Sequence, residues 1–286
     1  MTAKILDGRA LAQARSLELA GQVAAFTARH QVAPCLAAVL VGADPASKMY
    51  VESKARAAGK VGIRSETFHL AGDTTAGDYL ALIDDLNRRD DVHGILPQLP
   101  LPSQIDPQTV FERIDPDKDV DGLSPANAGR LALGRPRLIP ATPLGILVLI
   151  DHAGTAVEGA EAVIVGRSTI VGKPTALLLL ARNATVTICH SRTADLAAHT
   201  RRAKILVSAV GEPRLIRREM VRPGAVVIDV GNSHVAGKLA GDVDFEAVKD
   251  VASAITPVPG GVGPMTIAML LENTLAAARL QAEGRP

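Results

Sequence analysis

Aromatic side chains are scarce in this sequence of 286 residues: they make up 2% of it, and tryptophan is absent. The hydrophobic fraction is nevertheless 47%, so any core must be built from aliphatic side chains. Cysteine is rare as well, and Cys35 and Cys189 each lie inside an apolar run. These positions predict two small buried hydrophobic side chains. Two cysteines in a chain of this length also suggest a reducing compartment.

The sequence also lacks a charge excess and long apolar runs. With 31 basic and 30 acidic residues, the net charge of +1 leaves no electrostatic footprint for nucleic acid or an anionic membrane. The longest apolar runs, such as "ILVLI" and "ALLLLA", are too short to span a bilayer. The start, "MTAKILDGRALAQ", has charges where a signal peptide needs an apolar segment. We therefore expect a soluble cytoplasmic protein with neither a membrane partner nor a nucleic-acid partner.

Patterns for a metal site or a serine nucleophile are missing too. None of the seven histidines belongs to an HExxH motif or to a Cys/His cluster, and no GxSxG elbow occurs. We expect no metal site.

Short apolar runs rich in β-branched residues alternate with helix-like stretches along the chain. This alternation predicts an α/β fold with parallel sheets covered by helices. The expected strands are 35–42, 93–99, 161–166, 184–189, 204–210 and 225–231, and the expected helices are 9–29, 46–60, 75–88, 143–153, 174–182 and 264–280.

Two breaks suggest two α/β domains flanking a cleft. The segment 123–143 contains four prolines, and "TPVPGGVGP" (256–264) precedes the last helix. We place one domain at residues 1–139, completed by a C-terminal helix at 265–286. The second, at 140–264, is expected to be a Rossmann-like, doubly wound parallel sheet.

The most specific local motif is "EAVIVGRSTIVGKP" in the second domain. A buried strand ends at Gly166, a turn runs to Gly172, and Pro174 opens a helix, where proline is favoured. Amide groups at such a helix start can bind an anion. Five residues separate the two glycines, and a proline follows Lys173, so the motif is not a Walker A loop. It also departs from GxGxxG, which leaves a dinucleotide site and a plain strand–helix turn as alternatives.

The end of the next strand indicates which dinucleotide would bind. An NAD site usually has an acidic residue there, about 20 residues further on, to hold the ribose 2′-hydroxyl. This chain instead has "CHSRT", whose side chains from His190 to Thr193 include no carboxylate. These donor groups suit a 2′-phosphate and favour NADP over NAD.

Three features of the first domain carry polar groups. In "SKMYVESK", Tyr50 and Lys54 share one helix face, a spacing typical both of short-chain dehydrogenases and of ordinary surface helices. The strand "ILPQLPLP" ends in prolines with Gln98 between them. The loop "DPDKDVDG" has the opening spacing of a calcium loop but lacks the glutamate at position twelve. We also expect no helix to start at Ser124–Pro125, and we reject calcium.

Taken together, these motifs resemble the bifunctional methylenetetrahydrofolate dehydrogenase/cyclohydrolase family. The resemblance is colinear over essentially the whole chain and runs through "VLVGADPASKMYVESK", "PQLPLP", "DKDVDG", "VIVGRSTIVGKP", "GKLAGDVDF" and "PVPGGVGP". It implies NADP-dependent oxidation of 5,10-methylenetetrahydrofolate, followed by hydrolysis of the methenyl product to 10-formyltetrahydrofolate. It also implies a homodimer joined through the NADP domains. The short-chain dehydrogenase alternative fails, because Tyr50 and Lys54 precede the nucleotide turn instead of following it.

The resemblance also implies a role for each site residue. Lys54 is the acid–base group, since a desolvated lysine can have its pKa lowered toward neutrality. Gln98 tunes Lys54, Tyr50 flanks the folate rings, and Asp121 accepts hydrogen bonds from the pterin. The implied folate-binding residues are Tyr50, Val51, Glu52, Ser53, Lys54, Pro97, Gln98, Leu99, Asp121, Pro259, Gly260, Gly261, Val262 and Gly263, and those for NADP are Gly166, Arg167, Ser168, Ser191 and Asn232.

Three positions depart from the family pattern. Ala141 replaces a common cysteine, Ser124 replaces a common histidine, and Asn232-Ser233 replaces Ile-Asn. The family uses that isoleucine position near the nicotinamide, so Asn232 keeps a backbone contact but loses apolar packing. A cyclohydrolase with weakened dehydrogenase activity is therefore an alternative. A non-catalytic folate- or NADP-binding protein is a second, against which the intact Lys54, Gln98 and Asp121 speak.

Overall fold

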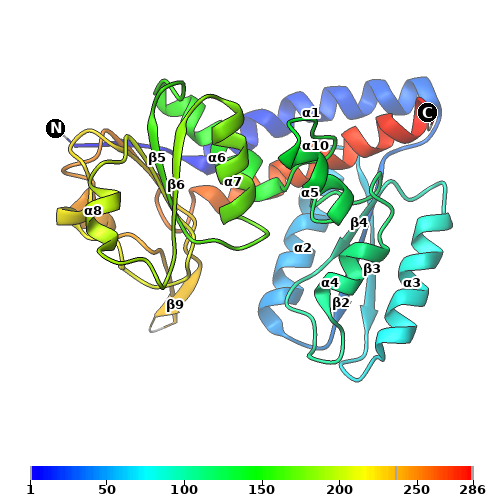
Figure 1. Ribbon diagram of the computed structural model, residues 1–286. Coiled ribbons are helices and arrows are strands. Elements are labelled where there is room, and N and C mark those ends of the chain that lie inside the picture. The colour runs from blue at the N-terminus through cyan, green and yellow to red at the C-terminus, as the bar shows by residue number, and fades with distance from the viewer. Residues whose placement is uncertain (1, 236, 285–286) are drawn as a thin grey trace. The chain divides into compact units, whose positions relative to one another are not determined.

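The structure, a computed structural model, describes residues 2–235 and 237–284 and divides into two compact units. The six-stranded unit contains the residues up to Ala12 together with Thr142–Thr266. The three-stranded unit contains Gln13–Ala141 and the residues from Ile267 onward. Each unit combines parallel strands with helices, which confirms the predicted α/β class (Figure 1).

The division departs from the predicted 1–139 domain at its N-terminal end. Strand β1 (Lys4–Ile5) pairs in parallel with β11 (Ala254–Ile255), so it extends the six-stranded sheet. A two-residue strand carries no periodicity that a sequence pattern could reveal. The first residues therefore group with the second half of the chain.

The three-stranded sheet has the order β3-β2-β4, with all strands parallel. Every residue of the central strand β2 is buried. Its residues alternate between faces, and Cys35, Ala37 and Val39 pack with Tyr79 and Ile83 of α3 in one core. The strands are β2 (Cys35–Val41), β3 (Arg64–Leu70) and β4 (Gly94–Pro97).

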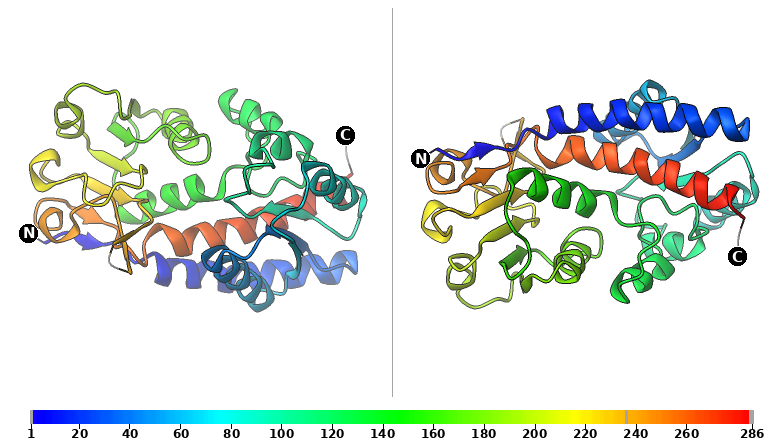
Figure 2. Two further views of the ribbon diagram at one scale, coloured as in Figure 1. Left: turned by 90° about the horizontal axis from the view of Figure 1, so that it is seen from below. Right: turned by 90° about the horizontal axis from the view of Figure 1, so that it is seen from above.

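Helices cover this sheet. In Figure 1, α2 and α3 lie on either side of the strands. Helices α1 and α10 run side by side, and Arg15 of α1 forms an ion pair with Glu272 of α10 at 2.7 Å (Figure 2). The helices are α1 (Gly8–His30), α2 (Pro45–Lys60), α3 (Ala76–Arg88), α4 (Pro107–Arg113), α5 (Pro125–Ala132) and α10 (Val262–Ala282).

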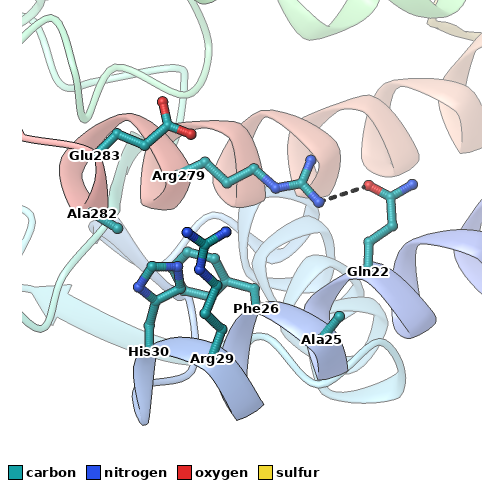
Figure 3. Close-up of a pocket in the computed structure, with 8 residues that line it drawn as sticks. All are labelled: Gln22, Ala25, Phe26, Arg29, His30, Arg279, Ala282 and Glu283. Carbon is teal, nitrogen blue, oxygen red and sulfur yellow. Dashed lines mark hydrogen bonds between the residues drawn. The ribbon is translucent and has the colours of Figure 1, made fainter.

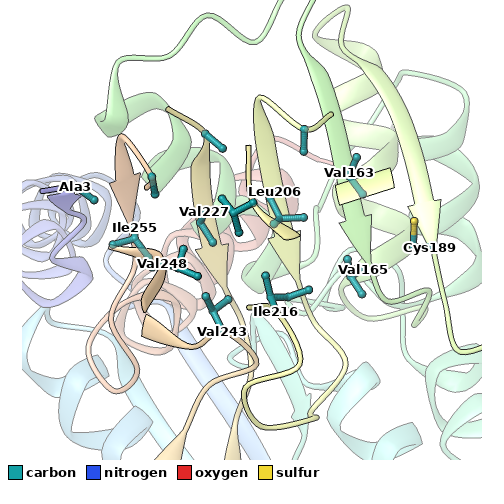
Figure 4. Packing of buried hydrophobic residues seen from close by; sticks show 14 residues of the cluster. Ala3, Val163, Val165, Cys189, Leu206, Ile216, Val227, Val243, Val248 and Ile255 are labelled. Carbon is teal, nitrogen blue, oxygen red and sulfur yellow. The ribbon is translucent and has the colours of Figure 1, made fainter. Parts of the chain in front are cut away.

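The six-stranded sheet is parallel throughout, in the order β1-β11-β8-β7-β5-β6. Its remaining strands are β5 (Glu161–Val165), β6 (Thr185–Cys189), β7 (Ile205–Ser208) and β8 (Val226–Asp229). Side chains in register on four neighbouring strands form one core, shown in Figure 4: Val163, Leu206, Val227 and Ile255. This arrangement is the doubly wound parallel sheet that the sequence predicts.

The other elements of this unit are short, apart from α6 and α7. They are α6 (Ala141–Ala153), α7 (Gly172–Ala181), α8 (Leu196–Thr200), the 3₁₀ helix η1 (Arg218–Met220), α9 (Phe245–Val248) and a hairpin of β9 (Ser233–Val235) with β10 (Lys238–Ala240). Cys35 and Cys189 are both free and fully buried, as predicted. Within the described ranges, no helix has both the length and the apolar character needed to cross a membrane.

Candidate active site

Helix α2 presents Tyr50 and Lys54 one turn apart. The helix starts cleanly because the Asp44 carboxylate accepts a hydrogen bond from the Ser47 amide at 2.8 Å and Pro45 occupies the first turn. Val51 is buried in the core, whereas Tyr50 and Lys54 are partly exposed. The helix therefore directs its tyrosine and lysine away from the packed face.

Lys54 is held by the predicted glutamine. Its Nζ donates to Gln98 Oε1 at 3.0 Å, and Gln98 Nε2 donates to the carbonyl of Leu99 at 2.7 Å. Gln98 is 6% exposed and follows β4, where its backbone N–H donates to the carbonyl of Val39 in the central strand. Because the side-chain nitrogen Nε2 of Gln98 donates to Leu99, the side-chain oxygen Oε1 faces the lysine.

Burial sets the protonation of the lysine. Desolvation of the ammonium group lowers the pKa of Lys54, and the negative charge of Asp121 opposes this effect. The pKa of Asp121 is raised to about 6, chiefly by burial. The charge of Lys54 opposes this rise, and the charge of Asp119 adds to it. A lysine with a lowered pKa close to a carboxyl group with a raised pKa is an arrangement typical of sites that move protons.

The loop that carries Asp121 is fixed by its neighbour Asp119. The Asp119 carboxylate accepts hydrogen bonds from the amides of Leu123 and Ser124, at 3.1 and 2.7 Å, and from Asn127 Nδ2 at 2.9 Å. The expectation that no helix starts here is wrong, because α5 begins at Pro125 with Ser124 as its N-cap. Proline in the first turn of a helix costs no hydrogen bond, and that signal was available in the sequence.

Lys118 is a buried cation that sequence reasoning missed. It is 2% exposed, and its Nζ donates to the carbonyls of Leu86, Asn87 and Arg89 at 2.6–3.0 Å. These carbonyls lie at the end of α3, so the lysine ties the acidic loop to that helix. A lysine among three aspartates is a pattern typical of a solvated turn, so the sequence gives no sign that this side chain points inward.

The other predicted folate residues fall into two groups. Beside Lys54 in the three-stranded unit, Pro97 and Leu99 flank Gln98, Ser53 is partly exposed, and Glu52 pairs with Arg56 at 3.7 Å. The segment from Pro259 to Gly263 belongs to the six-stranded unit, and its last two residues already form the start of α10. The carbonyl of Gly260 in this segment accepts a hydrogen bond from the amide of Arg9 at 3.2 Å.

The turn after β5 has the form of an anion site. Gly166 has φ +125°, and a Cβ there would collide with the carbonyl of Ala209 after β7, so only glycine fits. Ser168 Oγ accepts hydrogen bonds from the amides of Val171 and Gly172, both at 3.2 Å, at the start of α7. Arg167 and Ser168 are exposed beside this helix start.

The remaining predicted cofactor residues follow neighbouring strands. Ser191 is exposed after β6, where the amide of His190 donates to Thr193 Oγ1 at 2.8 Å and shapes a turn. Asn232 is exposed after β8. These positions and Gly166 all lie at the carboxyl ends of strands in one parallel sheet, the edge at which α/β proteins bind ligands.

A pocket of about 280 Å³ opens elsewhere, between the last turns of α1 and α10 (Figure 3). None of the predicted site residues lines it. Arg29 and Arg279 lie in the last turns of their helices, where a cation stabilises the helix dipole, and Arg279 donates to Gln22 Oε1 at 3.1 Å. The lining residues are Gln22, Ala25, Phe26, Arg29, His30, Arg279, Ala282 and Glu283.

Comparison with known proteins finds the same two-part organisation. The protein-family model for the tetrahydrofolate dehydrogenase/cyclohydrolase catalytic domain matches residues 6–121. The family model for the NAD(P)-binding domain of the same enzymes matches residues 140–282. The chain is 56% identical over 279 residues to the bifunctional protein FolD of Bordetella avium, covering 97% of this chain and 98% of that protein.

Solved structures of the same family match the fold of this chain over nearly its whole length. The bifunctional enzyme FolD, methylenetetrahydrofolate dehydrogenase/cyclohydrolase, from Campylobacter jejuni superimposes with a TM-score of 0.95 at 47% identity, covering 98% of this chain and 99% of that one. The FolD of Trypanosoma brucei, solved with NADP and an inhibitor, gives a TM-score of 0.95 at 38% identity over 99% of this chain and 100% of its own.

Proposed function

Because this chain belongs to the tetrahydrofolate dehydrogenase/cyclohydrolase family, we propose that it catalyses two successive reactions on one-carbon folates. The first oxidises 5,10-methylenetetrahydrofolate to the 5,10-methenyl form with NADP⁺. The second adds water to the methenyl form and opens the ring to 10-formyltetrahydrofolate. The observation that carries the proposal is the Lys54–Gln98 hydrogen bond next to Asp121, in a chain that matches both domains of the family.

The six-stranded unit is the part that would hold NADP. Its sheet reverses strand order between β5 and β7, and dinucleotides bind at such a switch point. Gly166 lets the turn after β5 pass close to the backbone that follows β7, and the exposed Arg167 and Ser191 suit a 2′-phosphate. Asn232 would contact the cofactor through its backbone. When bound, NADP⁺ accepts the hydride.

Hydride loss leaves a cation spread over two nitrogens, so the protein's part in that step is to position the folate. Tyr50 would flank the rings, with Val51, Glu52 and Ser53 forming the rest of that helix turn. Pro97 and Leu99 would line the folate beside Gln98, and the loop of Pro259, Gly260, Gly261, Val262 and Gly263 would close against it. Asp121 would accept hydrogen bonds from the pterin N–H groups.

The hydrolysis needs a group that moves protons, and Lys54 is the candidate. Its lowered pKa makes the neutral amine accessible, which can take a proton from the attacking water. The protonated amine can then return that proton to the leaving nitrogen. The Gln98 oxygen would hold the ammonium in place in the protonated state.

The test is a near-ultraviolet time course with 5,10-methylenetetrahydrofolate and NADP⁺, run beside NAD⁺. Growth of the NADPH absorbance with little methenyl intermediate is expected. Absence of NADPH, with added methenyl-folate still hydrolysed, would instead favour the cyclohydrolase with a weakened dehydrogenase. That alternative rests on Asn232 and Ser233, which replace Ile-Asn.

Replacing Lys54 tests the assigned proton transfer. Lys54→Met keeps the aliphatic stem but removes the amine, so cyclohydrolase kcat should fall by about 100-fold or more, while NADP⁺ binding persists. Lys48→Met, an exposed position on the same helix, is the matched control. Unchanged hydrolysis by Lys54→Met would reject the role of this lysine.

The assembly and setting are also proposals. We infer a cytoplasmic homodimer joined through the six-stranded unit, without nucleic-acid or membrane partners. The support is the outermost strand β6, where Ile188 is 40% exposed, together with helix α7, which packs against β6 and whose Leu180 is 58% exposed. An uncovered strand edge with apolar neighbours is a surface on which a second copy can pair.

A further inference from the structure

Two aspartates of the six-stranded unit are buried and have no role in the proposed chemistry. Asp242 is 0% and Asp229 is 3% exposed. Asp229 ends strand β8, two residues after Val227, and Asp242 directly precedes Val243; both valines belong to the core shown in Figure 4. Buried carboxylates are costly unless hydrogen bonds satisfy them, so their partners show what they do.

The Asp242 carboxylate organises the segment that follows β7. Its Oδ2 accepts hydrogen bonds from Ser208 Oγ at 3.0 Å and from the Val210 amide at 2.8 Å, and its Oδ1 accepts from the Glu212 amide at 3.0 Å. Three donors on alternate residues of one segment fix its backbone path.

The Asp229 carboxylate ties the end of β8 to the segment that carries Asp242. It accepts from the amides of Gly231 and Asp242, both at 2.9 Å on Oδ1, and from that of Val243 at 2.9 Å on Oδ2. A Cβ on Gly241 would collide with this carboxylate, so the backbone packs directly on it. Burial raises the pKa of Asp229 to about 6, although the hydrogen bonds from the three amides oppose this effect.

A further hydrogen bond, outside the two carboxylates, closes the arrangement. Ser233 Oγ, just after Asn232, donates to the carbonyl of Gly211 at 2.8 Å. The two carboxylates and this serine therefore join three segments, 208–212, 229–233 and 241–243, into one cluster.

The strand register places this cluster next to the glycine turn. Val165, Ser208 and Asp229 are partners across β5, β7 and β8, so the three strands end together. The carbonyl of Ala209, inside the segment held by Asp242, is the group that a side chain at Gly166 would strike. The cluster therefore lies on the β7 and β8 side of the switch point, and β6 lies on the other side. A dinucleotide whose phosphates bind at the glycine turn extends over both sides.

We propose that Asp242 and Asp229 are positioning residues for NADP, holding the 209–212 and 230–233 segments in the shape that the cofactor binds, without touching it themselves. This rests on the proposed function, because it assumes that the glycine turn takes NADP. Position 242 requires an aspartate because both carboxylate oxygens accept hydrogen bonds. In an asparagine, the side-chain NH₂ group would replace one of these acceptors and face a hydrogen-bond donor.

The test is Asp242→Asn in the full chain, with NADP⁺ binding followed by calorimetry and hydrolysis of methenyl-folate followed in parallel. We expect the NADP⁺ dissociation constant to rise about tenfold, with a matching rise in the dehydrogenase KM for NADP⁺. Cyclohydrolase kcat/KM should change by less than about twofold, because Lys54 and Gln98 belong to the other unit. Asp250→Asn, an exposed aspartate nearby in sequence, should leave both properties unchanged.

Ser208→Ala is the milder second variant. It removes one of the three donors to Asp242 and should raise the NADP⁺ dissociation constant by about threefold. Unchanged NADP⁺ affinity in folded Asp242→Asn overturns the proposal, as does equal loss of both activities in both variants, which would indicate a general structural role. If Asp242→Asn does not fold, Ser208→Ala decides alone. Lack of NADP⁺ binding by the unmodified protein would reject the proposed function itself.

Discussion

At the scale of single residues, the charge of Asp121 offsets part of the lowering that burial imposes on the pKa of Lys54. In Asp121→Asn the opposing charge is gone, so the pKa of Lys54 falls further and the neutral amine forms at lower pH. The limb of the cyclohydrolase kcat/KM profile that rises with pH should move to lower pH, even though weaker pterin binding reduces the overall rate. Asp73→Asn, an exposed aspartate of the same unit, should leave the limb in place; a fixed limb in Asp121→Asn would contradict the coupling.

The sequence identified the candidate catalytic residues of the site but not the buried polar residues that hold the surrounding loops. Lys54, Gln98 and Asp121 follow from the family resemblance, and the Lys54–Gln98 hydrogen bond is present, although their chemical roles stay predictions. Lys118 and Asp242 lay in motifs that had been quoted, yet their inward direction depends on partners far along the chain, such as Leu86 and Ser208. Sequence spacing cannot reveal such contacts.

At the scale of elements, Lys118 joins the acidic loop to the end of α3. Lys118→Met leaves one buried and two partly buried carbonyls without this donor, and we expect the free energy of unfolding to fall by about 2–4 kcal/mol. The measurement is the urea concentration that halves cyclohydrolase activity, because this activity belongs to the same unit. The control is Lys48→Met, whose parent side chain is exposed. An unchanged midpoint would show that the ammonium contributes nothing to holding the loop.

Apolar strands were predictable, and polar or short elements were not. Each expected strand overlaps a strand of the structure, because buried parallel strands are continuous apolar runs. Strand β3 was missed, since "RSETFHL" pairs only with β2 and keeps polar residues, including Arg64 and Glu66, which join an ion-pair cluster. Helix α5 was missed because a proline was taken as a break, when it stands at a position that favours it.

At the scale of the whole molecule, the exposed edge at β6 predicts dimerisation. Ile188→Lys places a charge on that edge, so the dissociation constant of the homodimer should rise about 100-fold. Sedimentation velocity over a dilution series would measure it. Leu133→Lys, at an exposed leucine of the three-stranded unit, should leave the association unchanged. A monomeric unmodified protein, or equal effects of the two variants, would exclude this edge as the interface.

The pairing of β1 with β11 and the grouping of α10 with the three-stranded unit have a consequence for synthesis on the ribosome. The six-stranded unit needs β1 and also Ala254–Ile255, which is synthesised long after it. The three-stranded unit needs Asn273 and Gln281 of α10, which donate to the carbonyls of Val120, Ile139, His93 and Asp117. Neither unit can therefore complete its fold until β11 or α10 has been synthesised, so the earlier part of the nascent chain remains partly unfolded until then.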